Sequence, residues 1–362
     1  MLNYFSVAGF KSIRELKDFK LSNLNILIGA NGSGKSNFVS LFKMLNSIIE
    51  SQLQIYVGVS GGADNILYFG HKQTDKIELD LRFGNNGYRC SLIPAEGDAL
   101  VFEEEVGLFH NKASFSEPYQ HSMGGGHKES LIQKMTEDSK IERFVLDEMS
   151  SWKIYHFHDT SDSSKMKKTC DLHDNAFFRA DASNLASYLY FLRKKHEYEY
   201  KMIVDTIRLV APFFDDFQLR PSPFNEKSIQ LEWKHKNSDS YFSANSLSDG
   251  TLRFICLAVL LLQPPDKLPR TVLLDEPELG LHPYAIAVLA GMLRAAANKT
   301  QVILATQSVT LINQSEPEDI IVTDRKNGES LFHRLERSEM VNWLENYGLG
   351  ELWEKNIFGG RP

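Results

Sequence analysis

The sequence Gly29-Ala30-Asn31-Gly32-Ser33-Gly34-Lys35-Ser36 matches the phosphate-binding pattern G-x-x-x-x-G-K-[S/T]. A strand-like apolar segment, residues 24–28, precedes it, and an amphipathic stretch with apolar residues at helical spacing, residues 38–48, follows it. The glycines permit the tight turn in which successive N–H groups point at phosphate oxygens, and the following helix directs its positive N-terminal end at the same anion. The sequence therefore predicts a nucleotide-binding loop between a strand and a helix.

The polar residues of this loop have expected roles in holding a nucleotide. Lys35 is expected to neutralise the β- and γ-phosphates and so to assist catalysis, and the Ser36 hydroxyl is expected to bind Mg²⁺. The loop residues predicted to contact the nucleotide are Asn31, Gly32, Ser33, Gly34, Lys35, Ser36 and Asn37. The alternative is a glycine-rich turn that binds nothing, and the strand–loop–helix context argues against it.

Residues 271–277, Thr-Val-Leu-Leu-Asp-Glu-Pro, form an apolar run that ends in two carboxylates. Such a run is typical of a central strand of a parallel sheet, and ligands bind at the carboxyl ends of such strands. Asp275 is expected to hold Mg²⁺, directly or through water, and Glu276 to serve as the general base for the attacking water. The acidic pair alone would equally fit a helix N-cap, but the phosphate loop upstream favours the catalytic interpretation.

Residues 247–251, Leu-Ser-Asp-Gly-Thr, precede a long apolar stretch. They resemble the signature motif of ABC-type ATPases, L-S-G-G-Q in its common form, with Asp249 in place of the first glycine and Thr251 in place of the last residue. Ser248 and the Gly250 amide, at the start of a helix, are expected to bind a γ-phosphate. Capping of the helix by the serine is the alternative, and the two interpretations coexist because a phosphate can replace the capping group.

Residues 301–305 predict a further buried strand, which Thr306-Gln307-Ser308 follows. The corresponding switch segment of ABC-type ATPases often reads A-T-H-S, and its histidine meets the γ-phosphate. Gln307 stands at that position in this chain and is a candidate catalytic residue. An amide can hydrogen-bond a phosphate and orient water, but it cannot carry a proton. The sequence therefore predicts nucleotide binding and leaves rapid, histidine-assisted hydrolysis open.

The order of these motifs, with Phe10-Lys11-Ser12 ahead of the phosphate loop and Asp-Glu-Pro-Glu at residues 275–278, resembles the ABC-type ATPases of the SMC, RecF, Rad50 and OLD group. The resemblance implies an α/β fold, a P-loop ABC-type ATPase head with a mixed sheet core and an inserted, largely helical lobe. It implies ATP and Mg²⁺ as cofactors. It also implies a head-to-tail homodimer. Each nucleotide would lie between the Walker motifs of one subunit (Walker A, the phosphate loop, and Walker B, the strand that ends in Asp275 and Glu276) and the signature of the other. A larger oligomer stays open.

The chain between Lys35 and Asp275 is longer than one compact nucleotide fold needs, so an inserted lobe is expected. We predict an N-terminal ATPase subdomain at residues 1–85, an inserted β/helical lobe at 86–240, a second ATPase half with signature, Walker B and switch at 241–325, and a C-terminal tail at 326–362. The Q-loop residue stays open: His71 or Gln73 could serve. No sustained heptad pattern is present, which excludes the long coiled coil of chromosome-tethering SMC proteins.

The composition is that of a globular protein: 362 residues, 42% hydrophobic and 24% charged, with a formal net charge of −7. The acidic balance argues against a protein whose whole surface coats nucleic acid. The longest apolar run, residues 254–262, is shorter than the roughly 20 residues that span a bilayer, and the N-terminus lacks signal-peptide features. Cys90, Cys170 and Cys256 form no C-x-x-C pair. We therefore expect a soluble cytoplasmic protein with no membrane partner.

Two further groups of residues have competing interpretations. Residues 152–159 predict a strand with His156 and His158 on one face and Asp159 close by; these could bind a metal, whereas a strand that joins the sheet is the simpler explanation. The basic runs at residues 165–168 and 193–196 could contact DNA or form a solvated charged face, and the acidic total favours the latter. DNA therefore stays open as a partner.

The resemblance implies a role in phage defence or DNA repair. OLD-type proteins carry a Toprim nuclease after the ATPase, and the stretch after Ser308 is too short to contain one. We therefore expect an ATPase that acts as sensor or regulator in a bacterial phage-defence module, with a nuclease-like effector on a separate chain. A RecF-like DNA-repair clamp and a nucleotide-gated scaffold with little turnover are the alternatives. The aromatic-rich residues 340–353 either dock on the core or form the mount for the effector.

Overall fold

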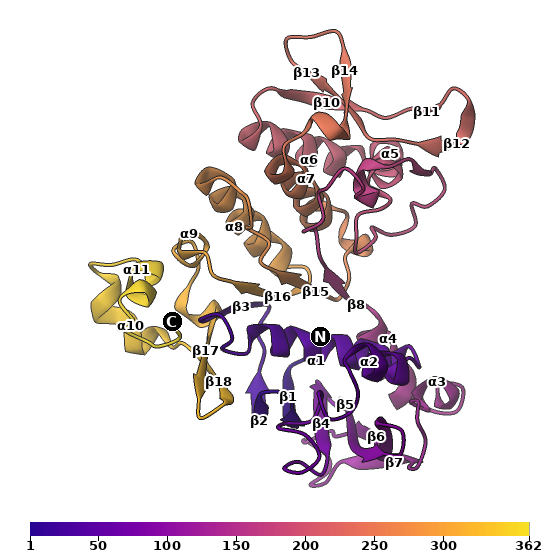
Figure 1. Cartoon of the computed structure of the whole chain (residues 1–362), viewed down its shortest axis with the longest axis vertical. Coiled ribbons are helices and arrows are strands. Elements are labelled where there is room, and N and C mark those ends of the chain that lie inside the picture. Colours follow the sequence, from indigo (N-terminus) through magenta and orange to yellow (C-terminus); the bar gives the residue numbers. More distant parts are fainter. Residues whose placement is uncertain (362) are drawn as a thin grey trace. The chain divides into compact units, whose positions relative to one another are not determined.

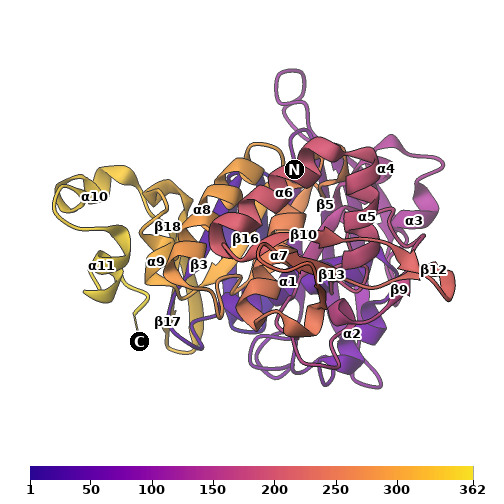
Figure 2. The ribbon, with the colours of Figure 1, turned by 90° about the horizontal axis from the view of Figure 1, so that it is seen from above.

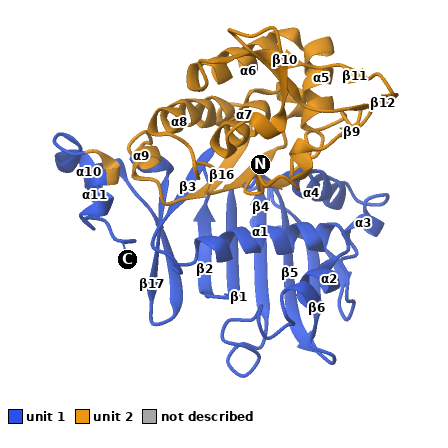
Figure 3. Cartoon of the chain, turned by 45° about the horizontal axis from the view of Figure 1, so that its top comes forward, with its two compact units in different colours: residues 1–152, 317–347, 351–362 blue, residues 153–316, 348–350 orange. Residues whose placement is uncertain are grey.

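The computed structural model describes residues 1–361, which form two compact units (Figure 3). Unit 1 comprises residues 1–152, residues 317–347 and the stretch from Glu351 onward, and unit 2 comprises residues 153–316 and 348–350. Each unit therefore combines stretches that lie far apart in the sequence. The predicted site residues fall into two groups, one in each unit, and the two groups are described separately below.

The larger sheet of unit 1 is antiparallel and has the strand order β2-β1-β4-β5-β6-β7. Its strands are β1 (Tyr4–Phe10), β2 (Ile13–Lys20), β4 (Ile77–Phe83), β5 (Asn86–Ala95), β6 (Ala99–Phe109) and β7 (Tyr119–Gly124). Buried residues alternate along β4 with more exposed ones, because successive side chains of a strand point to opposite faces. Helix α1 (Lys35–Ile49) crosses the buried face (Figure 3), where the ring centroids of Phe38 and Phe42 lie 5.6 and 6.3 Å from that of Phe5 in β1.

A second group of strands in unit 1 leads into the phosphate loop. Strand β3 (Leu24–Ile28) pairs in parallel with β17 (Ile320–Lys326), which pairs antiparallel with β18 (Glu329–Arg334). All five residues of β3 are buried, as expected for an apolar strand that is covered on both faces. The remaining helices of the N- and C-terminal stretches are α2 (Leu53–Val59), α3 (Ile132–Met135), α4 (Lys140–Ser150), η4 (Pro317–Asp319), α10 (Arg337–Leu344) and α11 (Leu349–Glu354).

Unit 2 is built on two parallel strands, β15 (Thr271–Asp275) and β16 (Gln301–Thr306), with β8 (Trp152–Tyr155) next to β15. Its main helices are α5 (Leu185–Lys195), α6 (Glu197–Val210), α7 (Asp249–Leu262) and α8 (Pro283–Ala297); α6, α7 and α8 pack against one another (Figure 2). Helix α9 (Val309–Ile312) and the short turns η1 (Lys165–Lys167), η2 (Ala244–Ser246) and η3 (Pro265–Lys267) complete the helical part.

Two small three-stranded sheets lie in the stretch between β8 and α7 (Figure 1). One has the order β10-β13-β14, from β10 (Phe214–Gln218), β13 (Glu232–His235) and β14 (Tyr241–Ser243). The other has the order β11-β12-β9, from β11 (Pro221–Ser222), β12 (Asn225–Ile229) and β9 (Cys170–Asp171). These sheets and helices α5 and α6 lie in the second half of the stretch that separates the phosphate loop from the signature motif.

The fold class predicted from the motifs is confirmed. Parallel and antiparallel pairs meet at β17, which makes the sheet mixed. The predicted strands at residues 24–28, 271–277 and 301–305 correspond to β3, β15 and β16. No helix among residues 1–361 combines the length and the apolar character that crossing a membrane demands.

Candidate nucleotide-binding and catalytic site

The phosphate loop in unit 1 joins β3 to α1 and depends on glycine at two positions. Gly32 and Gly34 have φ values of 78° and 122°, a region that L side chains rarely adopt. A Cβ on Gly34 would also clash with the side chain of Ser330. Helix α1 begins at the next residue, so its free N–H groups face the loop. The loop therefore has the backbone conformation and the helix end that phosphate binding requires.

The side chain of Lys35 is buried within this loop. Its Nζ donates hydrogen bonds to the carbonyl oxygens of Gly29 and Ala30, at 2.6 and 3.0 Å. These carbonyls hold the ammonium at the start of α1, where an incoming phosphate would meet it. Ser36, the predicted Mg²⁺ ligand, is exposed in the first turn of the same helix. Asn31 and Gly32 are likewise exposed, so the loop presents its outer side to solvent.

A series of hydrogen bonds connects the phosphate loop to the turn after β1 and to β18. Asn37 donates from Nδ2 to the Ser12 hydroxyl at 2.6 Å, and the Ser12 and Ser330 hydroxyls are 2.7 Å apart. Ser330 in turn donates to the carbonyl of Ser33 at 2.6 Å. The sequence predicted Asn37 as a nucleotide contact, and in the structure its amide binds the turn that follows β1. Sequence reasoning missed Ser330, because it lies in β18, far along the chain, and belongs to no motif.

A hollow of about 590 Å³ adjoins the loop within unit 1. Lys11, Asn37, Phe69 and Arg325 are among the residues that line it, and Arg325 also donates to the Gly32 carbonyl at 3.2 Å. The Phe69 ring is 56% exposed, which leaves an aromatic face beside the loop. This hollow combines aromatic, amide and cationic groups, as a site for a nucleotide base and sugar would.

The segment considered for the Q-loop borders this hollow. His71 lies outside its lining and contacts Asp64, with 2.5 Å between Nδ1 and Oδ1. Hydrogen bonds from the backbone and side chain of His71 lower the pKa of Asp64, so this carboxylate stabilises the turn. Gln73 is exposed. The Q-loop residue stays a prediction.

In unit 2 the predicted general base and the predicted switch residue meet. Glu276 directly follows β15, and its carboxylate Oε1 accepts a hydrogen bond from Nε2 of Gln307 at 2.7 Å. Its backbone N–H donates to the Ala305 carbonyl at 2.8 Å. The contact arises because β15 and β16 are parallel neighbours in register, so their carboxyl ends lie together. Glu276 has a φ of 42°, a strained conformation of the kind that clusters at functional sites.

A second carboxylate, Glu278, lies beneath this pair. Its Oε1 accepts from the Thr306 hydroxyl at 2.5 Å and from the Gln307 N–H at 3.3 Å. Its Oε2 is buried and finds no hydrogen-bond partner within residues 1–361. Burial raises the pKa of this carboxyl. Glu278 therefore fixes the backbone of the switch segment. In the sequence, only its position in the Asp-Glu-Pro-Glu run pointed to this residue.

The signature motif forms the start of α7. Ser248 is the N-cap residue: its hydroxyl accepts from the Thr251 N–H at 3.2 Å and lies 2.9 Å from the Thr251 hydroxyl. The serine is exposed, so an external phosphate could replace the capping contact. A Cβ on Gly250 would clash with the carbonyl oxygen of Gly280, so glycine lets the signature pack on the loop that follows β15.

The histidines considered for a metal site lie next to the predicted base. Nε2 of His158 is 3.0 Å from the carbonyl oxygen of Asp275, while the ring centroid of His156 lies 6.2 Å from that of His158. Within residues 1–361 no group of three or more His, Cys, Asp or Glu side chains could hold a metal ion. Strand β8 ends at Tyr155, so the predicted strand is shorter than expected and both histidines lie beyond it.

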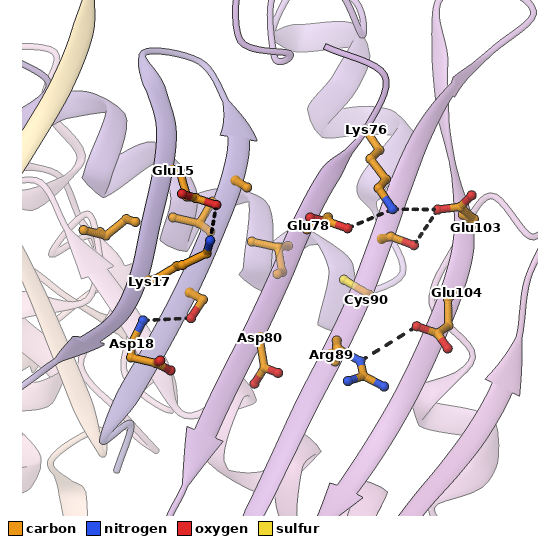
Figure 4. A pocket seen from close by; sticks show the side chains of 16 residues that line it. Glu15, Lys17, Asp18, Lys76, Glu78, Asp80, Arg89, Cys90, Glu103 and Glu104 are labelled. Carbon is orange, nitrogen blue, oxygen red and sulfur yellow. Dashed lines mark hydrogen bonds and ion pairs between the residues drawn. The ribbon is translucent and has the colours of Figure 1, made fainter.

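Another hollow of unit 1 lies elsewhere. About 620 Å³ in volume, it lies over the outer face of the antiparallel sheet, the face away from α1 (Figure 4). Its charged side chains pair along and across the strands, as Glu15–Lys17, Lys76–Glu78 and Arg89–Glu104. None of the predicted site residues lines it. It is a solvated sheet face, separate from the phosphate loop.

A family model and solved structures are similar to this chain. A family model described as "AAA domain, putative AbiEii toxin, Type IV TA system" matches residues 24–313. No curated protein matches the chain at a significant level. An Smc head bound to the C-winged helix domain of ScpA aligns with a TM-score of 0.61 and 14% identity, over 93% of this chain and 99% of that one.

A second solved structure gives a similar result. It is an Smc head domain with an extended coiled coil, bound to the C-terminal domain of ScpA derived from Pyrococcus furiosus. It aligns with a TM-score of 0.53 and 14% identity, over 95% of this chain and 98% of that one. At this level of identity the two alignments show a shared fold, that of the Smc head.

Proposed function

The chain belongs to the family described as "AAA domain, putative AbiEii toxin, Type IV TA system", and on this premise we propose that it is a Mg²⁺-dependent ATPase with a regulatory role. The observation that carries the proposal is the hydrogen bond from Gln307 to Glu276 at the carboxyl end of β15. In this proposal it joins a general base to a water-orienting amide, two groups that can activate and position the water that attacks a phosphoanhydride.

Nucleotide binding rests on the phosphate loop. The loop N–H groups and the start of α1 would hold the phosphates, and Lys35 would leave its two carbonyl partners to neutralise the β- and γ-phosphates. Oxygen ligands suit Mg²⁺, and in unit 1 the exposed Ser36 hydroxyl would be one of them. In unit 2 the partly exposed Asp275 carboxylate is the other oxygen ligand that we propose. When bound, Mg²⁺ would neutralise charge on the phosphate oxygens.

Hydrolysis rests on the residues of unit 2. Glu276 would accept the proton of the attacking water. Gln307 holds that carboxylate through Nε2, and its side-chain oxygen is free to accept from the same water. Ser248 and the Gly250 amide, exposed or partly exposed at the start of α7, would contact the γ-phosphate of a nucleotide held by a second copy. The active form would then be a head-to-tail homodimer, with a larger oligomer open.

The test is phosphate release by the purified chain, with and without Mg²⁺, alongside binding of a fluorescent ATP analogue. Glu276→Gln should bind the analogue as the wild type does and lose turnover, because only the base is removed. Lys35→Ala should lose binding. Hydrolysis by Glu276→Gln at the wild-type rate would show that Glu276 is not the base, and absence of phosphate release from the wild type would reject the ATPase assignment.

For the biological role, we propose a sensor or regulator of a bacterial phage-defence module whose nuclease-like effector is a separate cytoplasmic chain. The family description, which names a toxin and a type IV toxin–antitoxin system, supports a defence context. Helix α10 and its flank offer a surface for such a partner, because Val341, Trp343 and Tyr347 are 51, 41 and 38% exposed.

Two other roles have less support. A RecF-like DNA clamp needs accessible cations; Lys165 and residues 193–195 are exposed, but Lys165 pairs with Asp181 at 3.1 Å and the Lys167 side chain is buried. A nucleotide-gated scaffold with little turnover is favoured by Gln307, which cannot carry a proton. Stimulation of phosphate release by duplex DNA would identify the clamp, and ATP-dependent dimerisation without phosphate release would identify the scaffold.

A further inference from the structure

One arginine joins three segments of unit 2. Arg253 lies about one turn into α7, five residues after Ser248, and its side chain leaves the helix toward the end of β15. The guanidinium donates three hydrogen bonds to backbone carbonyls: Nε to Phe157 at 3.1 Å, Nη2 to His158 at 2.9 Å and Nη1 to Leu279 at 2.8 Å. Two of these carbonyls follow β8, and the third belongs to the loop that follows the predicted base.

The same segments are linked to the catalytic carboxylates by further contacts. The His158 ring reaches the carbonyl of Asp275 at 3.0 Å, so the residue held by Arg253 in turn contacts the end of β15. Gly250, in the signature, packs against the carbonyl of Gly280. A ring of contacts therefore runs from the signature through Arg253 and His158 to Asp275, and returns through the loop at residues 276–280.

This ring is tightly packed. The hollow lined by His158, Arg253, Asp275 and Glu276 has a volume of about 10 Å³, at the lower limit of what one water molecule needs. This hollow has no room for a ligand. All three hydrogen bonds of the guanidinium go to backbone carbonyls, so a displacement of α7 would act on the segments that Arg253 holds.

We propose that Arg253 is a positioning residue that couples the two ATP sites of the dimer. The inference rests on the proposed head-to-tail arrangement. In that arrangement Ser248 serves the nucleotide bound by the partner copy, whereas Asp275 and Glu276 serve the nucleotide of their own chain. A phosphate that docks at Ser248 shifts the first turn of α7, and Arg253 transmits the shift to His158 and Asp275. Nucleotide bound at one site thereby determines the position of the catalytic carboxylates at the other site.

The chemistry of arginine explains why this residue type is required. A guanidinium presents five N–H donors in a fixed plane and stays charged, so it can hold carbonyls from different segments at the same time. A lysine ammonium at this position would keep the charge but would lack the planar set of N–H donors. It could therefore not hydrogen-bond the segments before and after β15 at the same time. A purely structural role predicts lost stability only, whereas coupling predicts lost cooperativity.

The test compares Arg253→Lys and Arg253→Gln with Arg294→Lys. The control variant removes the guanidinium of Arg294, which lies in helix α8 and donates a hydrogen bond to the backbone carbonyl of Gln314. Phosphate release is measured against ATP concentration, together with binding of a fluorescent ATP analogue and the melting temperature. Wild type and control should show a Hill coefficient near two, the number of sites.

Both Arg253 variants should show a Hill coefficient near one and a kcat roughly fivefold or more lower, with analogue affinity within about twofold of wild type. A Hill coefficient near two in both folded variants would overturn the coupling role, as would a coefficient of one in an active wild type. Those results would leave the ATPase assignment intact. If the wild type released no phosphate, the ATPase assignment would fail, and cooperative binding of the analogue, lost in the Arg253 variants alone, would still decide the coupling.

Discussion

The side-chain amide of Gln307 donates a hydrogen bond to the carboxylate of Glu276, with 2.7 Å between Nε2 and Oε1. This hydrogen bond fixes the orientation of the carboxylate that we propose as the general base. The amide cannot give up or take up a proton, so the pair has one proton acceptor and one positioning group. Substitution of Gln307 therefore tests the role of this hydrogen bond most directly.

Gln307→Ala should lower kcat by at least about tenfold and leave the binding of an ATP analogue unchanged, because the base loses the group that orients it. Gln307→His should hydrolyse ATP faster than Gln307→Ala, since an imidazole can both donate to Glu276 and carry a proton. Single-turnover phosphate release measures both variants. Equal rates for wild type and Gln307→Ala would show that the hydrogen bond has no catalytic role.

Ser248 should act on the nucleotide of a second copy. Ser248→Arg and Lys35→Ala each damage a different half of the shared site, so a mixture should recover one working site per dimer. Phosphate release by the mixture is compared with that of either variant alone. Asn245→Arg, an exposed position ahead of the signature, is the control and should retain activity. A mixture without activity at any ratio would contradict the shared site.

Glu278 should make stability depend on pH. Burial raises its pKa in the folded protein above the unfolded value. Its contribution to stability is therefore fully present below the unfolded pKa and is lost as pH rises through the folded pKa. Glu278→Gln is neutral throughout, so its melting temperature relative to wild type should be higher at about pH 8 than at about pH 5.

Thermal unfolding of both proteins across this range provides the measurement. The exposed Glu226→Gln is the matched control, and its difference from wild type should change little with pH. A relative melting temperature of Glu278→Gln that stays constant or falls with rising pH would refute the assignment of a raised pKa to Glu278.

The two C-terminal tryptophans should behave differently. Trp353 is 7% exposed, so Trp353→Ala should destabilise the fold by about 3–5 kcal/mol. Trp343 is 41% exposed, so Trp343→Ala should leave the melting temperature nearly unchanged and reduce co-purification with the product of the neighbouring gene, the proposed effector. A complex that survives Trp343→Ala and Val341→Ala together would exclude α10 as the mount.

The sequence determined what is local. The glycines and Lys35 of the phosphate loop, the apolar β15 and the capping serine of α7 are each encoded in a few consecutive residues. Backbone conformation, burial on both faces and helix capping depend on near neighbours, so the pattern of residue types was sufficient. The order of these motifs along the chain then predicted the fold class, which the structure confirms.

Only the tertiary structure decided which distant residues meet. The pairing of β15 with β16 brings Gln307 to Glu276, β18 brings Ser330 to the phosphate loop, and helix α7 brings Arg253 to His158. These contacts join residues that lie tens to hundreds of positions apart and carry no shared local pattern. Strand order and helix packing set them, because a side chain's partner is decided by which elements pack together and not by its neighbours along the chain.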